Sequence, residues 1–148
     1  MPPIRWHLYV VDLEPRIGTK PGKQRPCLAV QPTEFSEGGL ESTVVLPLST
    51  QLAPAETFPL RVRVPKGTCG LRRDSDILVD QILAWDNALF RRDLGALPEP
   101  LQQDVRAALK EFLDLLAPSR GRLDAISLRS HDVLLLTFDM YGETLPIS

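Results

Sequence analysis

The first 85 residues alternate between short apolar segments and loops rich in proline, glycine and charge. The apolar segments lie at residues 6–13, 26–31, 43–48, 58–64 and 77–83 and are rich in β-branched, aromatic and leucine side chains. The fourth alternates most clearly: Leu60, Val62 and Val64 lie on one face, and Arg61 and Arg63 on the other. Turn signals separate these segments. They predict five strands in a compact, strongly bent sheet or barrel.

The period of the pattern then changes to that of a helix. Pro98 and Pro100 suit a first helical turn, where backbone amides have no intrahelical partner. The apolar residues that follow recur at helical spacing: Leu101, Val105, Ala108, Leu109, Phe112, Leu113 and Leu116. They predict one amphipathic helix that ends near Leu116, before Pro118 and Gly121, and packs on the barrel. We expect one domain over residues 1–118 and an extension over residues 119–148.

Composition places the chain among ordinary globular proteins, with 43% apolar and 24% charged residues. No apolar run reaches the length of a membrane span, and the N-terminus lacks the pattern of a secretion signal, so we expect a cytoplasmic protein. The net charge of −2 argues against general nucleic-acid coating, but the charge is uneven. Residues 1–73 carry ten Lys/Arg and six Asp/Glu, whereas residues 74–116 carry four and nine. This asymmetry permits a local basic surface, although chance scatter would also produce it.

Most motifs of catalysis and metal binding are absent from the sequence. Cys27 and Cys69 are far apart and are expected to be reduced core residues. An acid–base pair of His7 and His131 is conceivable, but one strand histidine and one surface histidine is the simpler interpretation. Arg25 remains, with the segment PLSTQ at residues 47–51. An arginine fork suits phosphate oxygens, and hydroxyl or amide groups past a strand end can add donors, yet both are also ordinary loop features.

The order of these short motifs resembles the MazF/PemK (Kid) family of toxin endoribonucleases. The shared pieces are VDLEP at residues 11–15, GKQRP at 22–26, PLSTQ at 47–51, DS at 74–75, VDQI at 79–82 and LGAL at 94–97, followed by the helix. Each piece is weak alone, but together they cover residues 5 to about 116 in the family's order and spacing.

This resemblance implies an SH3-like, strongly bent β-barrel with a C-terminal helix, of the CcdB/MazF type, in a homodimer neutralised by a cognate MazE-like antitoxin. It also implies sequence-specific cleavage of single-stranded mRNA without metal or cofactor. The RNA's own 2′-hydroxyl attacks the phosphorus, which leaves a 2′,3′-cyclic phosphate and a 5′-hydroxyl. The family's catalytic arginine falls on Arg25, and its catalytic threonine falls on Ser49, with Thr50 as the substitute.

The resemblance also suggests which residues bind RNA. The candidates are Arg16, Lys20, Lys23, Gln24, Gln51 and Gln81. Arg61 and Arg63 either contact the RNA backbone as well or are simply solvated surface charges. Residues 18–21 are GTKP where the family usually has Gly-Ser-Glu-Gln, Trp6 and His7 replace an opening Gly-Asp, and Val10 replaces a frequent aromatic. Because such positions choose the RNA sequence, no cleavage motif is transferred to this chain.

Two other functions stay open on the same fold. One is a non-enzymatic toxin that binds a protein target such as gyrase, as CcdB-type toxins do, and the other is an inactive antitoxin-binding module. A gyrase poison does not need a phosphate-stabilising arginine beside a hydroxyl. The presence of both Arg25 and Ser49 therefore favours the enzyme.

The apolar run at residues 133–138 can add a strand to an exposed sheet edge, in cis or across a dimer. It either restrains the toxin by covering the RNA groove or antitoxin site, or it packs without a regulatory role. Deletion of residues 119–148 distinguishes the two. We expect unchanged RNA cleavage and antitoxin affinity, as a packing extension predicts. Faster cleavage by the truncated chain would support restraint instead.

Overall fold

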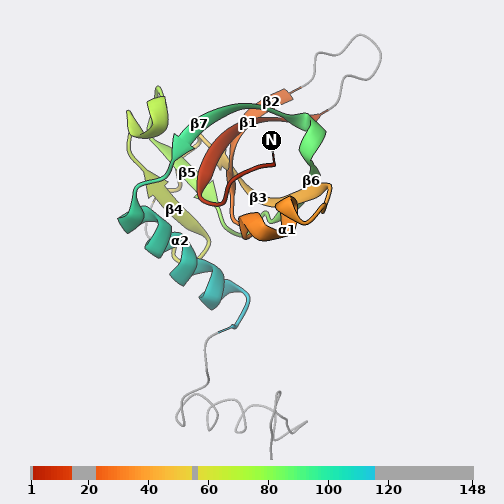
Figure 1. Cartoon of the computed structure of the whole chain (residues 1–148). Helices are drawn as coiled ribbons and strands as arrows, with labels where there is room; N and C mark the ends of the chain where they lie inside the picture. The colour runs from red at the N-terminus through yellow and green to blue at the C-terminus, as the bar shows by residue number, and fades with distance from the viewer. Residues whose placement is uncertain (1, 15–22, 55–56, 116–148) are drawn as a thin grey trace, which may run out of the picture. The chain divides into compact units, whose positions relative to one another are not determined.

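The computed structural model describes residues 2–14, 23–54 and 57–115 (Figure 1). The chain divides into a unit of residues Met1–Leu115 and a unit of residues Leu116–Ser148, and the second lies outside the described residues. The expectations for the extension, including its added strand, therefore stay predictions.

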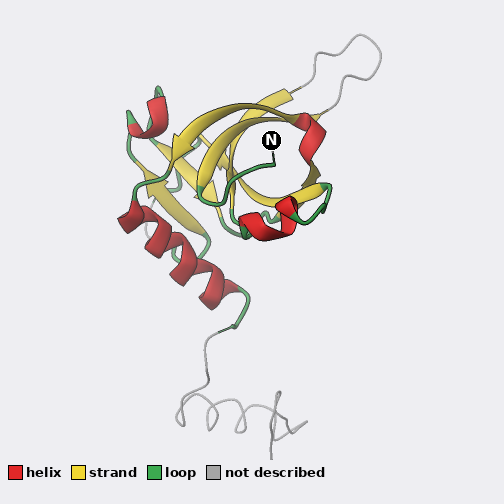
Figure 2. Cartoon of the chain, in the orientation of Figure 1, coloured by secondary structure: helices red, strands yellow, loops and turns green. Residues whose placement is uncertain are grey.

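The described unit is mainly antiparallel β-sheet with a helix near its C-terminal end (Figure 2). The strands are β1 His7–Glu14, β2 Lys23–Ala29, β3 Ser42–Ser49, β4 Arg61–Val64, β5 Ser75–Leu78, β6 Leu83–Asp86 and β7 Phe90–Ala96. The α-helices are α1 Thr33–Glu37 and α2 Glu99–Phe112, and two 3₁₀ turns are η1 Thr68–Gly70 and η2 Asn87–Leu89. This confirms the predicted fold class.

Strand β3 is the centre of the sheet, whose order is β4-β5-β3-β2-β1-β7 with β6 also paired to β3. The first half of β3 pairs with β6 over residues 42–45, and its end pairs with β5 at Leu48 and Ser49. Two strands therefore share one edge of β3, which requires a break in the chain between them. The prediction of a single strand over residues 77–83 was wrong for this reason: the backbone turns at Val79 and Asp80.

The core has two clusters, because the bent sheet buries residues on both of its faces. Leu8 belongs to the cluster that α2 covers with Val105 and Ala108, whereas its neighbours Tyr9 and Val11 belong to the other. A strand buried on both faces has a continuous apolar run rather than strict alternation. The continuous apolar runs at residues 8–11 of β1 and 44–48 of β3 follow from this arrangement.

The remaining differences from the predicted elements are local. The turn predicted at residues 37–39 is preceded by the short helix α1, and strands β6 and β7 were not predicted. The fourth strand begins only at Arg61; Val62 and Val64 are buried as predicted, but Leu60 is 40% exposed. Short or polar strands of this kind carry little periodicity of their own and form because a neighbouring strand pairs with them.

Helix α2 begins as predicted, with Pro98 at its N-cap, but ends at Phe112 rather than near Leu116. Asp114 adopts a left-handed conformation with φ of 56°. The Asp114 amide donates to the carbonyl of Glu111, and the Leu115 amide donates to that of Lys110 at 2.8 Å. This is the Schellman arrangement that ends many helices. It stops the helix one turn early, and Phe112 stays 39% exposed.

No helix in the ranges that the structure describes is long and apolar enough to cross a membrane. No group of three or more His, Cys, Asp or Glu side chains among the same residues is placed to hold a metal ion.

Gly95 lies at an irregularity in β7, where Leu8 pairs with Gly95 but Tyr9 pairs with Asp93, which leaves one extra residue in β7. Its φ is +106°, and a Cβ added there would meet no atom within 4 Å. Gly95→Ala therefore costs only backbone strain, which we expect to lower the free energy of unfolding by about 1–2 kcal/mol in urea titration. Ala96→Ser, at an exposed position of the same strand, should change it by less than about 0.5 kcal/mol. Equal stability of Gly95→Ala and wild type would contradict this account.

Candidate active site

The candidate site lies on a row of residues that runs across the sheet. Val11 pairs with Arg25, Ser49 pairs with Asp76, and Asp76 pairs with Arg63. The β2–β3 ladder pairs Cys27 with Pro47, and the same register carried two residues further places Arg25 opposite Ser49. Directly paired residues project from the same face of a sheet. Pairing of the strands therefore brings Arg25 and Ser49 together, although they are 24 positions apart in the sequence.

Arg25 is half-buried in β2 and is held at the end of β3. Its Nη1 donates a hydrogen bond of 3.2 Å to the carbonyl of Leu48. A groove of about 370 Å³ lies beside it, lined by Lys23, Gln24, Arg25, Pro26, Leu48, Ser49, Thr50 and Gln51. The single bond of Nη1 leaves other guanidinium donors available to a ligand in the groove.

The hydroxyl of Ser49 is held by the backbone that follows it. The Gln51 amide donates to Ser49 Oγ at 3.1 Å, which closes a short turn after β3. Because Oγ is the acceptor in this bond, the hydroxyl proton of Ser49 stays free to donate. Thr50 is exposed and also lines the groove. The site therefore presents a guanidinium and two hydroxyls to the same space, a set of donors suited to an anion.

A buried carboxylate fixes the segment after Ser49. Asp76 is 1% exposed, and its oxygens accept from the Ala53 amide at 2.7 Å and from Arg63 Nε. Arg63 also donates to the Ala53 carbonyl at 3.1 Å, and Arg61 lies 3.9 Å from the carboxylate. Burial alone would raise the pKa of Asp76. The hydrogen bonds from Arg63 and Ala53 and the charges of Arg63 and Arg61 lower the pKa by more than burial raises it, so the net shift is downward. We name Asp76, Arg63 and Ala53 the Asp76 clamp.

The structure places some of the predicted RNA-binding residues in the groove and others outside it. Lys23, Gln24 and Gln51 join Arg25, Ser49 and Thr50 in the groove lining. Gln81 lies in the turn between β5 and β6 and lines no part of that groove. Arg16 and Lys20 lie outside the described residues. Arg61 and Arg63 contact the Asp76 carboxylate and are therefore not simply solvated charges.

The structure also shows the surroundings of His7 and Cys27, which the sequence did not favour as catalytic residues. His7 Nδ1 lies 3.0 Å from the Asp93 carboxylate, in the β1–β7 part of the sheet, while His131 lies outside the described residues. Cys27 is fully buried, and burial raises the pKa of its thiol to about 12, although the nearby Arg25 charge favours the thiolate. Cys27 is thus a protonated core residue.

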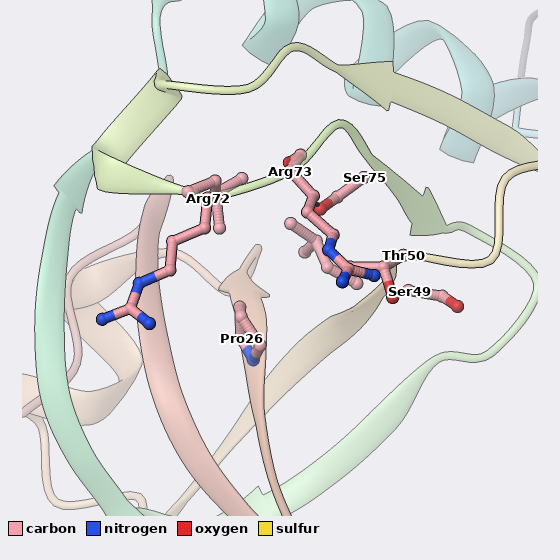
Figure 3. Close-up of a pocket in the computed structure, with 8 residues that line it drawn as sticks. Pro26, Ser49, Thr50, Arg72, Arg73 and Ser75 are labelled. Carbon is pink, nitrogen blue, oxygen red and sulfur yellow. Dashed lines mark hydrogen bonds between the residues drawn. The ribbon is translucent and has the colours of Figure 1, made fainter.

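Sequence reasoning missed two arginines beside the site. Arg72 and Arg73 line a second pocket of about 200 Å³, which shares Pro26, Leu48, Ser49 and Thr50 with the groove (Figure 3). Their adjacency in the segment RRDS was visible in the sequence, but nothing there indicated that the loop before β5 lies next to the end of β3. Antiparallel pairing of β5 with β3 supplies that proximity.

Residues 4–113 match the family described as PemK-like, MazF-like toxin of type II toxin–antitoxin system. The endoribonuclease MazF6 of Mycobacterium tuberculosis is 31% identical over 111 residues, which cover 75% of this chain and 96% of that protein. The endoribonuclease EndoA of Bacillus subtilis is 28% identical over 112 residues, or 76% of this chain and 95% of that protein.

Solved structures show the same fold at lower sequence identity. MazE–MazF from Deinococcus radiodurans has a TM-score of 0.64 and 22% identity, covering 78% of this chain and 99% of that chain. A mycobacterial endoribonuclease in complex with its cognate antitoxin has a TM-score of 0.61 and 20% identity, with 78% and 99% covered.

The Asp76 clamp generates a prediction about stability. Asp76→Asn removes the buried charge and should lower the free energy of unfolding at pH 7 by about 2–3 kcal/mol in urea titration. Because the folded-state pKa of Asp76 lies below its unfolded value of about 3.9, its contribution is present above that pH and is lost as pH falls through the lowered pKa. The difference between variant and wild type should therefore shrink in acid.

Asp80→Asn is the matched control, because Asp80 is an exposed carboxylate in the turn after β5. It should change stability by less than about 0.5 kcal/mol. An equal loss of unfolding free energy in the two variants would show that the Asp76 clamp does not stabilise the fold.

Proposed function

The chain belongs to the family of PemK-like, MazF-like toxins of type II toxin–antitoxin systems, and from this premise we propose that it is a sequence-specific endoribonuclease that cuts single-stranded RNA. The observation that supports this most directly is the shared groove of Arg25, Ser49 and Thr50, with Arg25 bonded to the carbonyl that precedes Ser49. Two of its relatives are themselves named endoribonucleases.

In the proposed reaction the 2′-oxygen of the RNA forms a bond to the neighbouring phosphorus and the bond from phosphorus to the 5′-oxygen breaks. The proton of the 2′-hydroxyl ends on the departing 5′-oxygen. The products are a 2′,3′-cyclic phosphate and a 5′-hydroxyl. Since the RNA supplies the nucleophile, the protein's task is to orient the phosphate and to stabilise the charge that develops on it.

Arg25 is assigned the charge stabilisation. Among the described residues, those that line the groove include no carboxylate and no imidazole, and their charged side chains are Arg25 and Lys23. An arginine keeps its proton at any physiological pH, and its planar fork matches two oxygens of a phosphorane. The bond to the Leu48 carbonyl fixes the guanidinium before RNA arrives, so little reorganisation is needed in the transition state.

Ser49 is assigned a donor role toward the same phosphate, with Thr50 as the alternative. Serine lacks the methyl group that stiffens χ1 in threonine. The hydrogen bond from the Gln51 amide compensates, because it restrains Oγ and leaves the proton free to donate. Lys23, Gln24 and Gln51 are assigned to the RNA on either side of the reacting phosphate. Arg16, Lys20 and Gln81 are RNA contacts on the resemblance alone.

The partners of the proposed enzyme are a cognate MazE-like antitoxin and a second copy of the chain in a homodimer. Two of the similar solved structures are complexes with an antitoxin, MazE–MazF from Deinococcus radiodurans and the mycobacterial endoribonuclease with its cognate antitoxin. We further propose that residues 1–118 form the toxin domain and that residues 119–148 extend it.

The proposal is tested on Arg25. Purified protein is incubated with a long single-stranded transcript in EDTA, and the ends are mapped. We expect cleavage with cyclic phosphate and 5′-hydroxyl ends, and a loss of at least about 100-fold in the cleavage rate of Arg25→Ala. Arg25→Lys, which keeps the charge but not the fork, should recover only part of that loss.

Arg92→Ala is the matched control, because Arg92 is an exposed arginine of β7 that does not line the groove. It should cleave at the wild-type rate. Wild-type activity of Arg25→Ala would overturn the mechanism, whereas the same result for Ser49→Ala would transfer the donor role to Thr50. Intact RNA at high enzyme concentration, also after removal of residues 119–148, would favour a protein-binding toxin or an inactive module.

A further inference from the structure

The second pocket, defined by its lining residues Pro26, Leu48, Ser49, Thr50, Leu71, Arg72, Arg73 and Ser75, has a composition unlike that of a core cavity. Its apolar wall comes from Pro26, Leu48 and Leu71. The lining also includes the exposed Arg72 and Arg73 and the hydroxyls of Ser49 and Thr50, whereas Ser75 is buried and its hydroxyl donates to the Arg73 carbonyl at 3.2 Å. We name it the Arg72–Arg73 pocket. An apolar wall beside cationic groups and hydroxyls suits a ligand that is anionic on one side and apolar on the other.

The two arginines lie differently in this pocket. In Figure 3, Arg73 extends from the loop before β5 toward Thr50 and Ser49, whereas Arg72 extends on the other side of Pro26. The pocket thus presents one guanidinium beside the hydroxyls of the proposed active site and a second farther along the surface. An extended polyanion with charges repeated along its length suits such a spacing better than one compact anion does.

The described residues supply no counter-charge to either arginine: none of their carboxylates lies within ion-pair distance of Arg72 or Arg73. The two acidic residues nearest in sequence are engaged elsewhere: Asp74 accepts from the Lys66 amide at 2.7 Å, and Asp76 belongs to the clamp with Arg63. The positive charge of the pocket is therefore available to a ligand.

We propose that Arg72 and Arg73 bind the backbone phosphates next to the scissile phosphate, so that the Arg72–Arg73 pocket continues the RNA groove past Ser49. This rests on the proposed function, because it needs RNA at Arg25. The shared lining of Pro26, Leu48, Ser49 and Thr50 makes the two hollows one continuous surface. Contacts to phosphate carry affinity without sequence preference, so these arginines strengthen binding but do not choose the cleavage motif.

The test uses a short fluorescent single-stranded RNA whose 2′-hydroxyls are methylated, so that it binds but is not cut. Binding is followed by anisotropy across a salt series for wild type, Arg72→Gln, Arg73→Gln and the double variant. We expect the double variant to bind about tenfold more weakly. The slope of log affinity against log salt should fall by about 0.7 for each phosphate that a variant no longer neutralises.

Cleavage of an unmodified transcript supplies the second readout. The double variant should raise KM with kcat and the cleavage motif unchanged, because it removes binding that is equal in ground and transition states. Arg92→Gln is the matched control and should leave affinity and salt slope unchanged. Both replaced arginines are exposed, and equal thermal melting would confirm that the fold is intact.

The outcomes distinguish a failure of this inference from a failure of the proposed endoribonuclease function. Wild-type RNA affinity and KM in the double variant, together with inactive Arg25→Ala, would overturn the role of Arg72 and Arg73 and leave the endoribonuclease standing. Equal weakening by Arg92→Gln would also overturn it, since the effect would then be one of general surface charge. If wild type neither binds nor cuts RNA, both proposals fail. A lower kcat at wild-type affinity would overturn the binding role and make these residues part of the catalytic step instead.

Discussion

The site depends on how the end of β3 is paired. On one edge β3 meets β2, which carries Arg25, and on the other its last two residues meet β5, which carries Asp76. Every group of the candidate site is positioned from one of these strands, from the turn after β3 or from the loop before β5. The β2–β3 ladder, which ends at the pair Cys27–Pro47, fixes the register, and continuing that register places Ser49 opposite Arg25. The positions of the groove residues therefore depend on strand pairing.

The basic residues around the site differ in whether a carboxylate offsets their charge. Arg63 and Arg61 contact the buried Asp76 carboxylate, so these charges offset one another. Lys23 and Arg25 line the groove, and Arg72 and Arg73 line the adjoining pocket. A protein with a net charge of −2 can therefore present a cationic track.

The proposed chemistry suits a site of this kind. Transesterification by the RNA's own hydroxyl needs preorganised donors more than it needs a protein nucleophile. Arg25 and Ser49 are both restrained by backbone partners, the Leu48 carbonyl and the Gln51 amide. The Asp76 clamp holds Ala53, four residues after Ser49, and so limits the motion of the segment that carries Thr50 and Gln51. Stability and positioning are linked through that carboxylate.

Local pattern in the sequence was enough to predict the first three strands, the start of α2 and the order of motifs that suggested Arg25 and Ser49. These features depend on apolar periodicity and on side-chain type, which a sequence displays directly. The break between β5 and β6, the end of α2 and the place of Arg72 and Arg73 could not be found that way. Each is decided by contacts between distant segments: two strands sharing one edge of β3, a left-handed Asp114, and a loop brought beside Ser49 by pairing. Register and proximity are properties of the folded backbone, and only the tertiary structure determines them.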